Sequence, residues 1–373
     1  MTPLLIESST QMDELVSQLG GEKIIAVDTE FQRETTYYPH LALVQIATDS
    51  IVACVDPLAF DAKPALQKIL LDESIVKIFH SCSQDLEVLF YYLGEVPRPI
   101  YDTQIANAFL TEQHQVGYAS LVEAELNVTL DKSQTRTNWL QRPLTTKQIQ
   151  YAGDDVLYLY QLHNILETKL NDSVRKEWFS NESAALTENN NEFKVATDKL
   201  WQRVKGSTKL AKNKLAIVQE IAIWREQLAQ QKDKIRRRVL ADETILDLAL
   251  SPPESANALS QRIQNNYVID DNDKQTLFNI IENAQTIPSE QWPDNRFAIL
   301  DGTQKQLLKT LQQQVSKKSE ELGIATAMLC SRKDLEQLIL QQQSDLSIKL
   351  SDQHDWRFKC IGEALLETVE SAN

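Results

Sequence analysis

The sequence predicts an α/β domain, with a mixed sheet flanked by helices, followed by two all-α helical bundles. In the first 170 of the 373 residues, short apolar runs of strand length alternate with segments of helical periodicity. Beyond residue 170 the strand pattern fades and helical patterns recur. A chain of this length can form two or three domains, each with its own core.

The predicted sheet begins with three closely spaced apolar runs. They are IIAVDTEF, LALVQIAT and IVACVDPL, at residues 24–31, 41–48 and 51–58. The short connections between them favour an antiparallel meander. IVKIFHS, at residues 75–81, has the composition of a further buried strand.

Helices are predicted at residues 64–72, 83–94 and 145–170 of the same domain. Gly94 ends the second of these as a C-cap would. Thr145 and Gln148 have the spacing of a capping box at the start of the third helix.

Two helical units are predicted beyond residue 208, each about as long as a small bundle. The first contains helical patterns at 214–233 and 242–251, and the second contains them at 304–323 and 332–340. The polar stretch 180–193 is predicted to be a boundary or a loop between helices.

Composition favours a protein of the cytoplasm. No uninterrupted apolar run approaches the ~18 residues of a membrane span, so no membrane partner is expected. The first residues lack the basic and apolar regions of an export signal. The four cysteines are far apart and form no C-x-x-C pair, which argues against a zinc site or a disulfide framework.

Taken over the whole chain, the net charge of −15 argues against nucleic acid as a partner. The charge is uneven, however. Residues 199–238 contain twelve basic and three acidic residues, a net charge of +9, so the rest of the chain carries −24. This basic segment is either a surface that binds a polyanion or a solvated linker and helix face.

Carboxylates occur at the ends or on the faces of three predicted elements. Asp28 and Glu30 end the first strand, Asp85 lies early in the helix 83–94, and Asp155 lies four residues after Tyr151 in the helix 145–170. Residues four apart share a helix face. Four converging carboxylates cannot all stay ionised without a counter-charge, and divalent cations are suited to oxygen ligands. Two such ions can hold a phosphodiester for hydrolysis.

Three motifs carry a resemblance to a known family. VDTEF, HSCSQDLEVL and YAGDDVLYL resemble the three motifs of the DEDD superfamily of 3'→5' exonucleases. RETTYYPHLALVQIA and LDKSQTRTNWLQRPLT resemble the ribonuclease D family, and IAIWREQLAQQKDKIRRRVLADETILDLAL resembles an HRDC domain. With Tyr151 four residues before Asp155, the sequence resembles the tyrosine branch of this superfamily. Asn138 stands where the family often has Asp, and Gly153 where it often has Ala.

The resemblance implies a ribonuclease H-like exonuclease fold and a set of site residues. Asp28, Glu30, Asp85 and Asp155 would bind two divalent metal ions, Mg²⁺ or Mn²⁺. Asp28 would bridge both ions, Asp85 would serve the leaving-group side and Asp155 the side of the attacking water, which Tyr151 would orient. RNA contacts are predicted at the following residues: Phe31, which is either a stacking or a core aromatic; His80, which is either a contact or a core or turn histidine; and Arg236, Arg237 and Arg238.

The predicted domains are a 3'→5' exonuclease catalytic domain (1–175), a helical connector (176–208), an HRDC domain (209–288) and a second HRDC-like helical domain (289–373). The implied activity is stepwise hydrolysis of RNA from its 3' end, releasing nucleoside 5'-monophosphates. The implied substrates are tRNA precursors and small structured RNAs with a free 3' end. A DNA-directed 3'→5' exonuclease and a catalytically silent RNA-binding module are the alternatives. The oligomeric state is not predicted.

Overall fold

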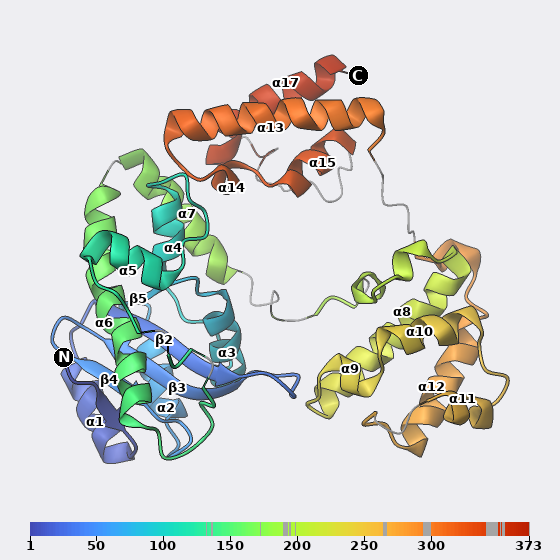
Figure 1. Ribbon diagram of the computed structural model, residues 1–373, viewed down its shortest axis with the longest axis horizontal. Coiled ribbons are helices and arrows are strands. Elements are labelled where there is room, and N and C mark those ends of the chain that lie inside the picture. The colour runs from blue at the N-terminus through green and yellow to red at the C-terminus, as the bar shows by residue number, and fades with distance from the viewer. Residues whose placement is uncertain are drawn as a thin grey trace. The chain divides into compact units, whose positions relative to one another are not determined.

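The computed structural model divides the chain into two compact units (Figure 1). Unit 1 comprises Met1–Phe31, Leu41–Asn190 and Ala298–Asn373, and unit 2 comprises Gln32–His40 and Asn191–Phe297. The structure describes all residues except 132, 136, 172, 189–192, 194, 198, 264–266, 294–299, 341–349, 351, 353, 354 and 373.

Unit 1 is built on a six-stranded mixed sheet with the strand order β1-β4-β3-β2-β5-β6. The strands are β1 (Leu4–Ile6), β2 (Ile24–Gln32), β3 (His40–Ala47), β4 (Val52–Val55), β5 (Val76–Phe79) and β6 (Ile100–Asp102). β3 and β4 are antiparallel, whereas β1 runs parallel to β4, and β5 runs parallel to both β2 and β6. The predicted mixed sheet is therefore confirmed. The three-residue strands β1 and β6 form its two edges, and the sequence pattern did not indicate either of them.

The described part of the α/β region also contains seven helices (Figure 1). They are α1 (Ser9–Gln18), α2 (Lys63–Leu70), α3 (Ser83–Leu93), α4 (Thr103–Ala108), α5 (Tyr118–Leu126), α6 (Thr146–Lys169) and α7 (Ser173–Glu188). The capping box of Thr145 and Gln148 starts α6, and Gly94 ends α3 in the left-handed conformation at φ 95°. Both features were predicted, and each satisfies backbone groups that a helix end leaves unpaired.

The polar stretch 180–193 is not a loop over its first nine residues, because α7 extends to Glu188. This helix buries Phe179 and Ser183 and contacts β6. Tertiary packing on one face therefore keeps helical a segment whose local composition favours a boundary.

The C-terminal helices α13 (Gly302–Leu322), α14 (Thr326–Leu329), α15 (Arg332–Leu340) and α17 (Glu363–Ala372) share a hydrophobic core with the α/β region. Trp356 stacks on Trp178 of α7 with a centroid distance of 4.7 Å. Arg357 donates to the Glu182 carboxylate at 2.6 Å and to the Met328 carbonyl at 2.7 Å. This part of the predicted domain 289–373 is thus joined to α7 through buried contacts. The boundaries of the four predicted domains remain predictions.

Unit 2 is a helical bundle with a core of its own. Its helices are α8 (Lys212–Gln231), α9 (Arg236–Val239), α10 (Asp242–Leu250), α11 (Ala256–Arg262) and α12 (Asp271–Ala284). The bundle also includes residues 33–39, which connect β2 to β3, and it buries Tyr37 of that connection. Within the described residues, no helix has the length and apolar character needed to cross a membrane.

Candidate active site

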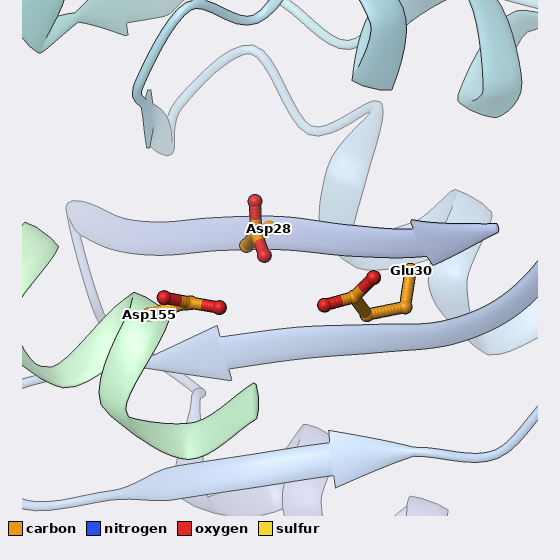
Figure 2. A group of neighbouring side chains, drawn as sticks. All are labelled: Asp28, Glu30 and Asp155. Atoms are coloured by element: carbon orange, nitrogen blue, oxygen red, sulfur yellow. The ribbon is translucent and has the colours of Figure 1, made fainter. Parts of the chain in front are cut away.

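Three carboxylates meet where β2 faces α6 (Figure 2). Asp28 and Glu30 are two residues apart in β2, so both project from the same face of the strand. Asp155 comes from α6, and ligand atoms of the three half-buried side chains all lie within 4.8 Å of one another. Ile25, Ala26 and Val27 are fully buried just before Asp28, and they fix the strand that presents these acids.

Asp85 approaches from α3 and is held by the residue between the two β2 acids. The Oγ1 of Thr29 donates to Oδ1 of Asp85 at 2.5 Å, and both residues are buried. Asp102 fixes the start of α3 by accepting the backbone N–H groups of Ser81 at 3.0 Å and Cys82 at 2.9 Å. Asp85 is not in the group of three, but its charge acts on Asp28.

All four predicted acids line one cavity of about 450 Å³. The other lining residues come from the strand, from α3 and α6, and from the segments around α5: Thr29, Phe31, His80, Ser81, Gln84, Gly117, Tyr118, Ala119, Ser120, Leu130, Asp131, Thr135, Tyr151 and Leu159. A cavity of this size can admit a small ligand or the end of a larger one.

Burial and mutual repulsion hold protons on this cluster. Burial, with Asp155 and Asp85 close by, raises the pKa of Glu30 to about 9. Burial and then Asp85, Asp155 and Glu30 raise the pKa of Asp28. Burial also raises the pKa of Asp85 to about 6 and, together with Asp154, that of Asp155 to about 7. Clustered oxygen ligands of this kind fit a divalent cation, whose charge would remove the cost of ionising them together.

Tyr151 lies beside the cluster and remains a phenol. Its hydroxyl is 3.4 Å from Oγ1 of Thr135, and its ring lies 6.0 Å from that of Trp139. Burial and the charge of Asp155 raise the pKa of Tyr151 well above its usual value. The hydroxyl is therefore protonated at neutral pH and is suited to hydrogen bonding rather than to proton abstraction.

Two of the residues predicted to contact RNA lie at this cavity. Phe31 is half-buried in its lining. The ring of His80 contacts Oγ1 of Thr103 at 2.9 Å and the carbonyl of Val116 at 3.0 Å, and burial lowers its pKa. The protein therefore engages both nitrogens of His80.

The three predicted arginines belong to unit 2 and differ from one another. Arg236 forms an ion pair with the buried Glu226 and lies over the ring of Tyr37. Arg237 and Arg238 are exposed and line a cavity of about 430 Å³ with Tyr267. The structure therefore separates one arginine with a buried partner from two that face solvent.

Two further residues of the cavity were missed by reasoning from the sequence. Thr29 holds Asp85, and Tyr118 donates its hydroxyl to the carbonyl of Asp154 at 3.0 Å while its ring lies 5.6 Å from that of His80. Thr29 alone had a local signal, its place between two acids in VDTEF. Tyr118 reaches the site through tertiary contacts that no spacing in the sequence indicates.

Comparison with known proteins shows the family to which the chain belongs. A model for 3'-5' exonuclease domains matches residues 3–171, and one for the HRDC domain matches residues 214–264. Ribonuclease D of Pseudomonas paraeruginosa is 34% identical over 93% of this chain and 92% of its own length. Ribonuclease D of Escherichia coli is 34% identical over 97% of this chain and 96% of its own length.

The fold agrees over the full length. The crystal structure of Escherichia coli RNase D, described as an exoribonuclease involved in structured RNA processing, has a TM-score of 0.85 at 30% identity. It covers 100% of this chain and 99% of that one. A protein from Bifidobacterium adolescentis, 23% identical with a TM-score of 0.72, shares the fold. The chain belongs to the ribonuclease D family of 3'→5' exoribonucleases.

Proposed function

We propose that the cavity at Asp28, Glu30, Asp85 and Asp155 hydrolyses RNA stepwise from its 3' end with two divalent metal ions, Mg²⁺ or Mn²⁺, releasing nucleoside 5'-monophosphates. The observation that carries the proposal is the cluster of Asp28, Glu30 and Asp155, whose ligand atoms lie within 4.8 Å of one another. Family membership implies dependence on a divalent metal, and the number and identity of the ions are part of the proposal.

The carboxylates would divide between the two ions. Asp28 would contact both, with Glu30 and Asp155 on the side of the attacking water and Asp85 on the side of the leaving oxygen. When bound, such ions supply an activated water and neutralise the charge that develops on the phosphodiester. Thr29 holds Asp85 in place through its hydroxyl, which donates to Oδ1.

Tyr151 would orient the attacking water through its hydroxyl. Its raised pKa keeps the proton on the phenol, so Tyr151 donates or accepts a hydrogen bond and does not serve as the base. Its position four residues before Asp155 brings the hydroxyl to the helix face that carries this acid.

RNA would reach the site with help from unit 2. The exposed Arg237 and Arg238 offer charge to phosphates, and Tyr267 in the same cavity offers a ring on which a base can stack. Arg236, which pairs with Glu226, is the least suited of the three arginines. We propose tRNA precursors and small structured RNAs with a free 3' end as substrates, in keeping with the description of the Escherichia coli relative.

A cytoplasmic location is proposed on the state of the cysteines. All four are free thiols, and Cys54, Cys82 and Cys330 are buried. Proteins of a reducing compartment keep their thiols in this form.

The test is a time course on a 5'-labelled RNA with a single-stranded 3' end, with Mg²⁺, with Mn²⁺ and with EDTA. We expect a metal-dependent ladder that shortens one nucleotide at a time from the 3' end. DNA of the same sequence in parallel separates an RNA-directed enzyme from a DNA-directed one, because the sugar 2'-OH is the difference. RNA that stays intact but bound under every metal condition would favour the silent binding module instead.

A further inference from the structure

The connection between β2 and β3 follows directly after the strand that carries Asp28 and Glu30, and it belongs to unit 2. Unit 2 begins at Gln32, two residues after Glu30, and the chain returns to unit 1 after His40. Tyr37 of this connection is 4% exposed and packs in the core formed by the helices of unit 2. Unit 2 therefore holds a segment that is covalently continuous with the strand bearing Asp28 and Glu30.

The side chain of Tyr37 is enclosed by polar groups of α8 and α9. Its hydroxyl donates to the Glu226 carboxylate and accepts from Nε2 of Gln230 at 3.0 Å. Arg236 donates to the same carboxylate, with its Nη2 2.7 Å from Oε1, and its guanidinium carbon lies 5.1 Å from the centre of the Tyr37 ring. Burial would raise the pKa of Glu226, but the hydrogen bonds from Arg236 and Tyr37 outweigh it, so the carboxylate stays ionised.

The backbone of the connection is held by a second acid. Oδ1 of Asp233 accepts the N–H groups of Tyr37 at 2.9 Å and Tyr38 at 3.0 Å, and its Oδ2 lies 3.0 Å from Nε2 of His40. Asp233 follows the end of α8 in the left-handed conformation, at φ 47°, where glycine is the usual residue. A glycine there could not bind the connection, so the acid adds contacts that the helix end alone does not require.

These five residues, Tyr37, Glu226, Gln230, Asp233 and Arg236, are called the Tyr37 network below. One member of the network starts the helix that carries the exposed arginines. α9 is four residues long, and Arg236 is followed directly by Arg237 and Arg238. A phosphate bound by these arginines would therefore act on the same short helix that holds the connection.

We propose that the Tyr37 network positions the end of β2 for catalysis, so that RNA long enough to bind Arg237 and Arg238 is hydrolysed faster than RNA that reaches only the acidic cavity. The inference rests on the proposed function and adds a role for unit 2 beyond binding. Tyr37 and Asp233 are positioning residues, since they act through β2 and touch neither the acids nor the cavity.

The experiment compares two 5'-labelled RNAs, one of about four nucleotides and one of about thirty, with the full-length chain. For Tyr37→Phe and Asp233→Asn we expect kcat on the long RNA to fall about 10-fold with KM unchanged, within the usual range of coupling between sites. Both kinetic constants on the short RNA should stay at the wild-type values. Asp270→Asn is the matched control, because Asp270 caps α12 and contacts Lys232 in the same unit.

A double-mutant cycle sharpens the test. If bound RNA acts through the network, adding Tyr37→Phe to Arg237→Ala/Arg238→Ala should cause no further loss of kcat on the long RNA, whereas independent contributions would multiply.

The proposal is overturned by equal losses on both RNAs, by a change in KM alone, or by no change in any constant. A wild-type chain that cleaves neither RNA would refute the proposed function itself. Cleavage of both with the same kcat would leave that function intact and refute this inference. Thermal unfolding of each variant separates a misfolded protein from an uncoupled one.

Discussion

Thr29 donates a 2.5 Å hydrogen bond to Asp85, although the two residues are 56 positions apart. The bond fixes one carboxylate oxygen of Asp85, which lines the acidic cavity. Thr29→Val should therefore raise the metal concentration needed for half-maximal activity by about 10- to 100-fold, as loss of a group that orients a metal ligand commonly does. Thr29→Ser keeps the hydroxyl and should stay near wild type in the same metal titration. A Val variant at the wild-type value beside an impaired Ser variant would show that the methyl group, and not the hydrogen bond, matters.

Tyr151→Phe removes a hydroxyl and little else. If the hydroxyl orients the attacking water, kcat should fall about 100-fold, the usual cost of losing one preorganised hydrogen-bonding group at a reacting centre. RNA affinity and metal dependence should change little, because the four acids remain. Tyr158→Phe, in the same helix but not among the described residues that line the cavity, is the control. A Tyr151→Phe enzyme with wild-type kcat would remove Tyr151 from the mechanism.

The raised pKa values predict how the metal-free protein responds to pH. Burial, Asp155 and Asp85 raise the pKa of Glu30 to about 9, whereas an unfolded glutamate titrates near 4. Between these values the folded protein binds more protons than the unfolded chain, so its stability falls as pH rises. The melting temperature without metal should decrease between about pH 5 and about pH 9, and Mg²⁺ or Mn²⁺ should raise it more at the alkaline end.

The same pH series on Glu30→Gln isolates this contribution. The variant should lose less stability with rising pH than the wild type, because one carboxyl with a raised pKa is gone. Glu112→Gln, a change at an exposed position, is the control. Identical slopes for wild type and Glu30→Gln would contradict the assignment of the repulsion to this cluster.

Local patterns in the sequence predicted the elements that carry the acids. The run Ile24–Val27 gave β2 its burial, the two-residue spacing placed Asp28 and Glu30 on one face, and the capping box started α6 where it was expected. Gly94 ended α3 for the reason that glycine favours a left-handed C-cap. These signals lie within a few residues of the feature that they determine.

The features that were not predicted depend on distant partners. Tyr37 donates a hydrogen bond to Glu226, 189 residues later, and the same glutamate accepts from Arg236, so neither side chain could be placed from its neighbours in sequence. β1 and β6 have three residues each, too few to show an alternation. α7 continues through a polar stretch because its partners are β6 and the C-terminal helices.

The glycine at position 153, where the resemblance to the family led us to expect alanine, is explained by Pro3. A Cβ at position 153 would lie 2.1 Å from Cγ and 2.9 Å from Cβ of Pro3, and 3.3 Å from Cγ1 of Val52. The turn of α6 that contains Tyr151 and Asp155 thus packs against Pro3, just before β1, with no room for a methyl group. Gly153→Ala should destabilise the fold by about 1–3 kcal/mol, the usual cost of overpacking, despite the ~1 kcal/mol by which alanine favours a helix.

Relief of the clash tests this explanation. Pro3→Gly removes both atoms that the methyl group would meet first, so Gly153→Ala should cost less stability in the Pro3→Gly background than in the wild type. The difference, measured by urea unfolding of the two single variants and the double variant, is the interaction between the two sites. Because the displaced turn carries Tyr151 and Asp155, Gly153→Ala alone should also lower kcat, and the double variant should recover part of it. Additive changes in stability would show that Pro3 does not set the requirement for glycine.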